Sequence, residues 1–406
     1  MDSIRRLRTD QVGSLLRPHP LLDARAAWQA GRLSEAGLRQ LEDEAILTAL
    51  RAQEAAGQQI YVDGEFRRTG FMTGFPDSVE GFVPDAYVPI AWKGGTGSEG
   101  ASPNTQLVIG QRLRPKKRIA KNEADFLRKH APGPFKLALP SPVNFAVIFW
   151  RQGVSDRAYE TPSEFLSDAA HILASEARAL AGEGTPYLQL DAPLYTHWAD
   201  GSLKAKYGKL GFEMDRFLDD AVAAENAVLD TAAPAVTGVH LCRGNSMGRW
   251  LAEGGYDPIA EKLFNELRCD RLLLEYDSPR AGDFAPLRHV PKGKTVVLGL
   301  ITTKHGALES RDEIMRQIDK AAHYLPLEQL ALSPQCGFAS SGHGNPLTEE
   351  QQWRKLELVT AVARKVWNGD KSKRPRYHRP AKKFQNEPSA STAGQNRPRP
   401  IIRLCE

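Results

Sequence analysis

Four side chains suited to metal binding stand at the carboxyl ends of apolar runs in this sequence. His240 lies at the end of one run, and Cys242 follows two residues later. Glu275 ends a second run, and Cys336 follows a third. Residues two apart on a strand point to the same face, so His240 and Cys242 can project together. One imidazole, two thiolates and one carboxylate form a borderline-soft ligand set, which predicts a tetrahedral Zn²⁺ site.

The spread of these ligands along the chain favours catalysis. Structural zinc sites usually use close pairs such as Cys-x-x-Cys, whereas these ligands come from three separate runs. Zinc rich in thiolate ligands suits a substrate sulfur, whose pKa it lowers. Glu65 and Asp191, which follow two more apolar runs, are candidates to hold the ammonium group of an amino-acid substrate. The alternatives are a packed core pair for His240 and Cys242, and salt bridges to Arg or Lys for the two carboxylates.

The composition is that of a soluble globular protein. The chain has 406 residues, of which 41% are hydrophobic and 25% are charged, which fits one large domain or two modest ones. It contains no run of 18 apolar residues and begins without an apolar signal region, so we expect no membrane partner. Four cysteines are too few for a disulfide scaffold in a chain of this length. A reducing cytoplasm is the expected location.

The positive charge of the chain is concentrated at its carboxyl end. The whole chain has a net charge of +5, but residues 371–406 hold ten Lys or Arg against two Glu, which leaves −3 for residues 1–370. This end also contains five Pro and few apolar residues, so it cannot bury enough surface to fold. We therefore predict a catalytic domain over residues 1–369 and a disordered tail over residues 370–406. A basic tail could contact nucleic acid, but the folded body gives no reason to expect such a partner.

Apolar runs alternate with amphipathic helices along most of the chain. Strands are predicted near residues 10, 60, 137, 188, 238, 273, 298 and 331. Helices are predicted over residues 34–56, 123–130, 163–181, 217–231, 258–267, 311–324 and 349–367. Eight strands alternating with helices predict an α/β fold, the (β/α)₈ TIM barrel. The alternative is a doubly wound open sheet, but the sequence lacks the Gly-x-Gly-x-x-Gly turn of a dinucleotide site.

An insertion follows the second predicted strand. Residues 87–92 and 106–112 read as two strands joined by a Gly- and Ser-rich loop over residues 94–102, which predicts a β-hairpin. Barrel enzymes carry their active sites at the carboxyl ends of the strands. The four candidate metal ligands and the two candidate substrate carboxylates all lie at such ends, so the fold prediction and the site prediction agree.

The motifs around these residues resemble the catalytic domain of cobalamin-independent methionine synthases, most closely the short members with a single barrel. The resemblance covers residues 8–368 and rests on His240-x-Cys242, Glu275 and Cys336, together with four longer motifs. These motifs are V-G-S-L-L-R-P at 12–18, D-G-E-F-R-R at 63–68, L-S-P-Q-C-G-F-A-S at 332–340 and G-N-P-L-T at 344–348.

This resemblance implies a complete reaction. A methylated tetrahydrofolate of the 5-methyltetrahydropteroyltri-L-glutamate type would give its methyl group to homocysteine, bound as its zinc thiolate, and methionine would form. The implied zinc ligands are His240, Cys242, Glu275 and Cys336. The implied residues around the amino-acid part of homocysteine are Ser14, Glu65 and Asp191.

The chain departs from the family pattern on the donor side. Asp191 is followed by Ala192 where the family has Glu. The family's proton-donating His falls on Lys304, with His305 as its neighbour, so these two are the predicted catalytic residues. The aromatic residue that stacks on the pterin has an offset counterpart in Trp150. The amino-terminal barrel of the long members is also absent.

Two other functions fit the same metal ligands. One is a zinc-dependent alkyl transfer to another thiol, which includes the opening of an epoxide and the use of a corrinoid methyl donor. The other is a zinc-stabilised binding module with a basic tail, which would need a closed metal site. The sequence does not determine the oligomeric state.

Overall fold

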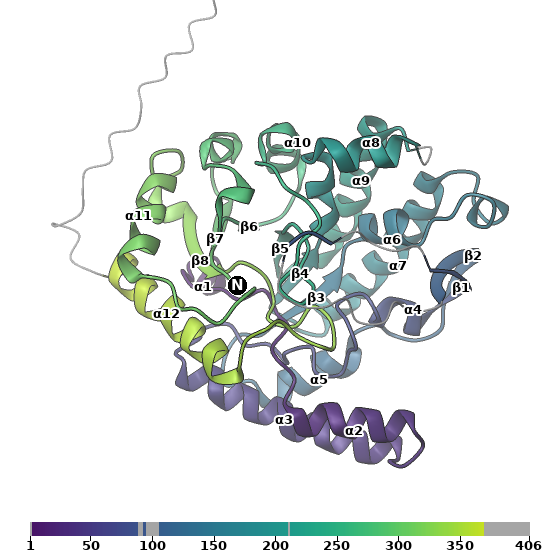
Figure 1. The fold of residues 1–406 in the computed structure, drawn as a ribbon, viewed down its shortest axis with the longest axis horizontal. Helices are drawn as coiled ribbons and strands as arrows, with labels where there is room; N and C mark the ends of the chain where they lie inside the picture. Colours follow the sequence, from purple (N-terminus) through teal and green to yellow (C-terminus); the bar gives the residue numbers. More distant parts are fainter. Residues whose placement is uncertain (1, 88–91, 95–104, 210–211, 369–406) are drawn as a thin grey trace, which may run out of the picture.

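The computed structural model describes residues 2–87, 92–94, 105–209 and 212–368. Its centre is a six-stranded parallel sheet in the order β3-β4-β5-β6-β7-β8, surrounded by helices (Figure 1). The strands are β3 (Lys136–Pro140), β4 (Tyr187–Asp191), β5 (Val236–Leu241), β6 (Arg271–Glu275), β7 (Thr295–Ile301) and β8 (Leu330–Pro334). Every residue of these strands is buried, as expected for parallel strands covered by helices. The six predicted strands from residue 137 onward are confirmed.

The strands predicted near residues 10 and 60 are reduced to single bridges. Thr9 pairs in parallel with Leu332 of β8, and Tyr61 pairs in parallel with Phe135 beside β3. These two segments close the barrel between β8 and β3. The prediction of two full strands there was wrong, but their places in the barrel were correct.

Side-chain amides replace backbone hydrogen bonds between these two segments. The Gln53 side chain accepts from Val62 N and donates to Val62 O. The Gln11 side chain donates to Ile60 O and to the Gln53 amide oxygen. We call residues 9–11 and 59–62 the barrel seam, because side chains join them where backbone ladders join the other strands.

The helices predicted from apolar periodicity are all present. They are α3 (Glu35–Ala55), α5 (Lys121–His130), α7 (Pro162–Gly182), α9 (Met214–Leu229), α10 (Asp257–Glu266), α11 (Arg311–Ala321) and α12 (Glu349–Trp367). Capping residues explain several boundaries. Ser34 accepts from Gly37 N at the start of α3, and Thr348 forms a capping box with Gln351 at the start of α12.

Five helices were not predicted. They are α1 (Asp2–Arg5), α2 (His19–Gln29), α4 (Gly74–Ser78), α6 (Pro142–Ile148) and α8 (Gly201–Lys209). Helices α1, α4 and α6 have four, five and seven residues, which is too short for a clear apolar period. Helix α2 begins after Pro18 without a side-chain cap.

The insertion is an antiparallel hairpin of β1 (Val79–Ala86) and β2 (Thr105–Pro115). The predicted second arm is confirmed. The arm that pairs with β2 is β1, which ends at Ala86; the predicted first arm, residues 87–92, includes residues 88–91, which lie outside the described residues. The correct arm was missed because Gly81 and Pro84 weaken its strand signal. Phe82 of β1 packs edge-on against Phe75 and Phe149, which seats the hairpin on the barrel.

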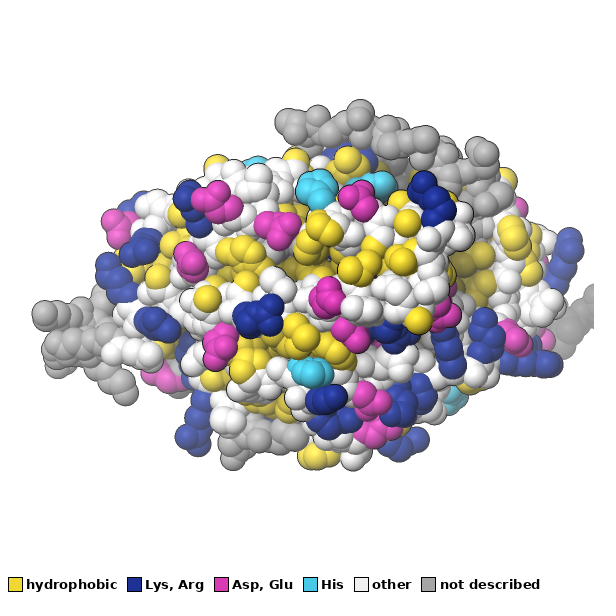
Figure 2. Space-filling model, turned by 90° about the horizontal axis from the view of Figure 1, so that it is seen from below, with side chains coloured by type: hydrophobic (Ala, Val, Ile, Leu, Met, Phe, Trp, Pro, Cys, Tyr) yellow, Lys and Arg dark blue, Asp and Glu magenta, His cyan; other side chains and the backbone are white. Residues whose placement is uncertain are grey.

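The surface carries charges of both signs. On the face in Figure 2, Lys and Arg side chains alternate with Asp and Glu, so this face offers no continuous basic area. Among the described helices, none is long and apolar enough to cross a bilayer. The predicted tail, residues 370–406, lies outside the described residues.

Candidate metal centre and active site

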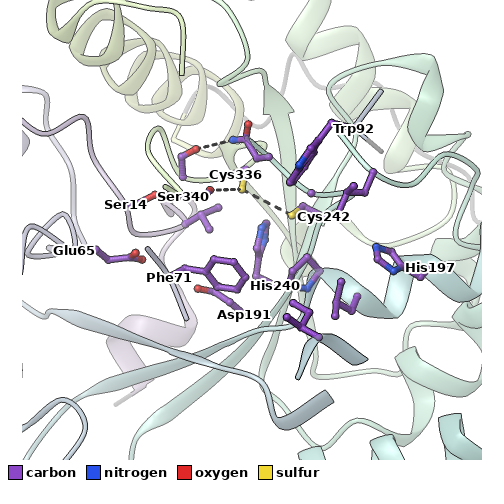
Figure 3. Close-up of a pocket in the computed structure, with 18 residues that line it drawn as sticks. Ser14, Glu65, Phe71, Trp92, Asp191, His197, His240, Cys242, Cys336 and Ser340 are labelled. Atoms are coloured by element: carbon purple, nitrogen blue, oxygen red, sulfur yellow. Dashed lines mark hydrogen bonds between the residues drawn. The ribbon is translucent and has the colours of Figure 1, made fainter. Parts of the chain in front are cut away.

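Sulfur and imidazole donors converge above the carboxyl ends of β5 and β8. His240 belongs to β5 and Cys242 follows it, whereas Cys336 follows β8. All three side chains are buried, and their donor atoms lie within 4.8 Å of one another. The Cys336 Sγ is 3.8 Å from the Cys242 Sγ (Figure 3). The fold therefore brings three of the four predicted metal ligands together.

The arrangement of these three side chains fits zinc. Both ring nitrogens of His240 are buried, and neither has a hydrogen-bond partner among the described residues. Buried polar atoms are normally paired, so this imidazole is suited to bind a cation. Two sulfurs each about 2.3 Å from a tetrahedral Zn²⁺ would lie about 3.8 Å apart, which matches the observed Sγ separation of 3.8 Å. Hydrogen bonding between the two thiols lowers the pKa of Cys336 well below its ordinary value and raises the pKa of Cys242.

Glu275 lies at the end of β6 but does not join this group of three donors. Its Oε2 accepts from Arg243 N at 2.8 Å and from Gln335 Nε2 at 2.9 Å. Its Oε1 accepts from Arg280 Nη2 at 2.9 Å. Burial alone would raise the pKa of Glu275, but the charges of Lys304, Arg243 and Arg280 lower it to about 2. The carboxylate is thus ionised and accepts hydrogen bonds from three residues, and its role as the fourth ligand stays a prediction.

A cavity of about 210 Å³ opens beside the three donors. Figure 3 shows Ser14 and Glu65 on one side of the donors, and Trp92 and His197 on the other. Asp191 also lines the cavity. The metal ligands thus stand between an acidic end and a largely aromatic end. A substrate that reaches both ends would have its middle atoms at the metal ligands.

The acidic end contains the three residues predicted to surround an amino acid. Burial raises the pKa of Glu65 to about 7, and burial also raises the pKa of Asp191. Glu65 adopts a φ of 59°, a left-handed conformation that non-glycine residues rarely adopt and that often marks a functional site. Ser14 Oγ accepts from Ala339 N at 3.3 Å, which ties it to the loop after Cys336.

The aromatic end contains residues that the sequence did not reveal. Trp92 lines the cavity, whereas the predicted Trp150 does not and packs against the hydrophobic core. The insertion carries Trp92 to the cavity because Lys93 pairs with Trp250 in an antiparallel bridge. The absence of a side chain at Gly244 makes room for it, since a Cβ there would lie 3.2 Å from the Trp92 ring. No local pattern marked Trp92, because a pairing between residues far apart in the sequence brings it to the cavity.

His197 and Phe71 also line the cavity without having been predicted. His197 belongs to the 3₁₀ segment Pro193–Trp198, which follows β4, and its Nδ1 lies 2.9 Å from the Tyr207 hydroxyl. Burial lowers the pKa of His197 to about 4, so its ring is neutral at neutral pH. The sequence feature that could have identified His197 is its position six residues after Asp191, which ends a predicted strand.

The two predicted proton donors are placed differently from each other. Lys304 is buried, and its Nζ has no hydrogen-bond partner among the described residues. Its charge acts on Glu275 and on Cys336. His305 is exposed to solvent. Neither side chain is among the residues that line the cavity.

Comparison with known proteins identifies the family. Residues 7–349 match the family model described as the catalytic domain of cobalamin-independent synthases. The chain belongs to the cobalamin-independent methionine synthase family. This is a family of methionine synthase-like methyltransferases, and the match spans the barrel, the insertion and all the predicted site residues.

Individual proteins are similar to this chain over most of its length. The chain is 35% identical over 365 residues to YxjH of Bacillus subtilis, an uncharacterised protein, and the match covers 89% of this chain and 94% of the relative. A solved structure from Listeria monocytogenes, named as a vitamin-B12-independent methionine synthase, superimposes with a TM-score of 0.67 at 26% identity, covering 89% of this chain and 98% of that one. The structure of a B12-independent methionine synthase from Shewanella sp. W3-18-1, in complex with selenomethionine, also has a TM-score of 0.67 at 22% identity, covering 89% and 97%. These likenesses confirm the predicted TIM-barrel fold.

Proposed function

We propose that this protein transfers a methyl group from a methylated tetrahydrofolate to the thiol of homocysteine, and so forms methionine. The observation that carries the proposal is the cavity in which three metal-binding side chains face an acidic end formed by Glu65 and Asp191. An amino acid with a thiol at the end of its side chain matches this layout. The Shewanella relative binds selenomethionine, the selenium analogue of the expected product.

The acceptor would span the acidic end and the metal ligands. Its ammonium group pairs with Glu65 and Asp191, and the positive charge favours the ionised form of both carboxylates. Its sulfur lies near His240, Cys242 and Cys336. A zinc ion held by these three residues, with Glu275 as the proposed fourth ligand, would lower the pKa of the substrate thiol and make it nucleophilic at neutral pH.

The donor would occupy the aromatic end. Trp92 offers a flat apolar surface to a ring system, in the role that the sequence assigned to Trp150. The sulfur attacks the methyl carbon, the sulfur–carbon bond forms and the bond from carbon to N5 of the folate breaks. Placing both substrates in one cavity makes this attack effectively intramolecular.

The leaving nitrogen keeps the electron pair of the broken bond and needs a proton. Lys304 and His305 remain our proposed source of that proton. Neither lines the cavity, so one of them must reach the donor when both substrates are bound. His197, whose ring lines the cavity, is the competing candidate.

The test is an assay with alternative donors. Zinc-loaded protein is incubated with homocysteine and, separately, with methyl-tetrahydrofolate as monoglutamate and triglutamate, with methylcobalamin, and with a short epoxide. We expect methionine from the folate donors. Replacing Lys304 and His305 together should slow this turnover by roughly 10²-fold or more, the scale of general acid catalysis. A matched variant, His197→Asn, tests whether His197 supplies the proton in place of Lys304 or His305.

A corrinoid donor or another thiol acceptor is the second candidate. Among the described residues that line the cavity, none is Lys or Arg, so the cavity wall offers no cation to the glutamate tail of a folate. Methionine formed only from methylcobalamin would refute the folate donor and leave the homocysteine acceptor standing. Alkylation of another thiol, with no methylation of homocysteine, would refute the acceptor as well.

A further inference from the structure

The buried side-chain amide of Gln189 holds Asp191, one of the two carboxylates proposed to bind the substrate. Gln189 of β4 lies two residues before Asp191 and is fully buried. Its Nε2 donates to Asp191 Oδ1 at 2.7 Å and to Val12 O at 2.7 Å. Its Oε1 accepts from Lys136 Nζ at 2.7 Å. All of the hydrogen-bonding capacity of the Nε2 group is therefore used.

The chemistry of the partners fixes the orientation of this amide. Lys136 carries only donors, so it must face the Gln189 oxygen, and Val12 O and the Asp191 carboxylate carry only acceptors, so they must face the nitrogen. Turning the amide over would break all three hydrogen bonds. Lys136 thus determines which end of Gln189 reaches Asp191.

Lys136 is itself fixed inside the barrel. Its Nζ donates to Asp10 Oδ1 at 2.8 Å and to the carbonyl oxygen of Gln11. Arg271 Nε lies 3.2 Å from Asp10 Oδ2, and the side chains of Lys136, Asp10 and Arg271 are completely buried. Asp10 and the Gln11 carbonyl oxygen therefore hold the Lys136 Nζ where it reaches the Gln189 oxygen.

We propose that Lys136 and Gln189 are positioning residues for the acceptor substrate. They fix Asp191 through its Oδ1, and leave Oδ2, which has no donor among the described residues, to bind the ammonium group in the cavity. The pair therefore makes binding depend on an amino group in the thiol substrate. This inference rests on the proposed function, because it assumes an amino-acid thiol as the acceptor.

The test compares two thiols that differ only in the amino group. Calorimetry measures the Kd of homocysteine and of 4-sulfanylbutanoate, which lacks that group, for the zinc-loaded full chain. In Gln189→Met, a substitution of similar volume, we expect the Kd of homocysteine to rise about tenfold or more, the scale for losing a hydrogen bond to a charged group. The Kd of 4-sulfanylbutanoate should stay within about twofold, which a merely structural change would not achieve.

Two further variants make the result decisive. Gln58→Met removes another buried amide, which donates to Leu356 O and Thr360 Oγ1 away from the cavity, and should change neither Kd. In an Asp191→Asn background, Gln189→Met should have no additional effect on homocysteine, because two residues that act through one another are not additive. An equal rise in both Kd values, or an undiminished effect in that background, overturns the proposal.

The outcomes also separate this inference from the proposed function. If wild-type protein does not bind homocysteine, both fail. If homocysteine binds and Gln189→Met discriminates between the two thiols, but no donor methylates homocysteine, the methyl-transfer function fails and the positioning role stands. If methionine forms but the variant does not discriminate, the positioning role alone fails.

Discussion

Replacing Glu65 should make the protein more stable at alkaline pH. Burial raises the pKa of Glu65 in the folded protein from 4.5 to about 7. In the unfolded chain the carboxyl group has its ordinary pKa. A raised pKa in the folded state means that ionisation of Glu65 opposes folding. The stability that a protonated Glu65 contributes is therefore fully present below about pH 4.5 and is lost as pH rises through about 7. Glu65→Gln removes the titration and keeps a neutral side chain of the same shape.

The size of the effect follows from the shift in pKa. A difference of about 2.5 pKa units corresponds to about 3 kcal/mol at pH 8, since each unit is worth about 1.4 kcal/mol. At pH 5 only about 0.8 kcal/mol of this cost is present. The stability of Glu65→Gln relative to wild type should therefore increase by about 2.5 kcal/mol between pH 5 and pH 8. The same variant should bind homocysteine more weakly, because one partner of the ammonium group is neutral.

Paired measurements isolate this effect from other titrations. Wild type and Glu65→Gln are unfolded in guanidinium chloride at pH 5 and pH 8, and the two proteins are compared at each pH so that the pH dependence of metal binding cancels. Glu350→Gln serves as the control, since the Glu350 side chain is 72% exposed. A stability difference between Glu65→Gln and wild type that stays constant from pH 5 to pH 8, or that favours wild type at pH 8, would refute the reasoning.

Three further predictions address the metal, the donor and the tail. Protein purified without added metal should contain about one zinc per chain. Elemental analysis should show a clear loss of zinc in Cys336→Ser, because a hydroxyl does not replace a thiolate at neutral pH. Full zinc occupancy in the Cys242→Ser, Cys336→Ser double variant would exclude the site. Trp92→Ala should raise the KM for the methyl donor about tenfold, the scale for losing one aromatic stacking surface, and leave the KM for homocysteine unchanged. Trp150→Ala should instead lower the melting temperature. If Trp150→Ala raises the KM for the donor and Trp92→Ala only lowers the melting temperature, Trp150 is the donor residue. Truncation after Gly369 should leave zinc content and melting temperature unchanged, because the removed residues show no apolar periodicity in the sequence, and a loss of several degrees would contradict this.

The residues proposed for the acceptor side could be located from the sequence, because each follows a predicted strand. The period of two placed His240 beside Cys242, and the barrel topology placed Glu65 and Asp191 at the same edge. Such positions depend only on strand order and direction. They are therefore determined once the alternation of strands and helices is recognised.

The residues of the proposed donor side could not be predicted, because their positions depend on contacts between distant loops. Lys93, the residue after Trp92, pairs with Trp250 and so brings Trp92 to the cavity, and no local pattern encodes this pairing. The donors around Glu275 come from residues near three different strand ends, and they decide which way its carboxylate points. Gln189 reads in the sequence as one more residue of a buried strand, and its role emerges only from its neighbours Lys136 and Asp191.

The barrel seam has a consequence for local opening of the fold. Its two segments are joined by the amides of Gln11 and Gln53 where other strands share a ladder of backbone hydrogen bonds. Backbone amides around residues 59–62 should therefore exchange with deuterated solvent sooner than those of β5 or β6, since fewer bonds must break together. Ser14 and Glu65 each lie three residues after one of these segments, so an amino acid held between them would link the two sides of the seam. Substrate binding should then slow exchange there more than anywhere else in the barrel, because the bound ligand connects two segments that are otherwise joined by side chains.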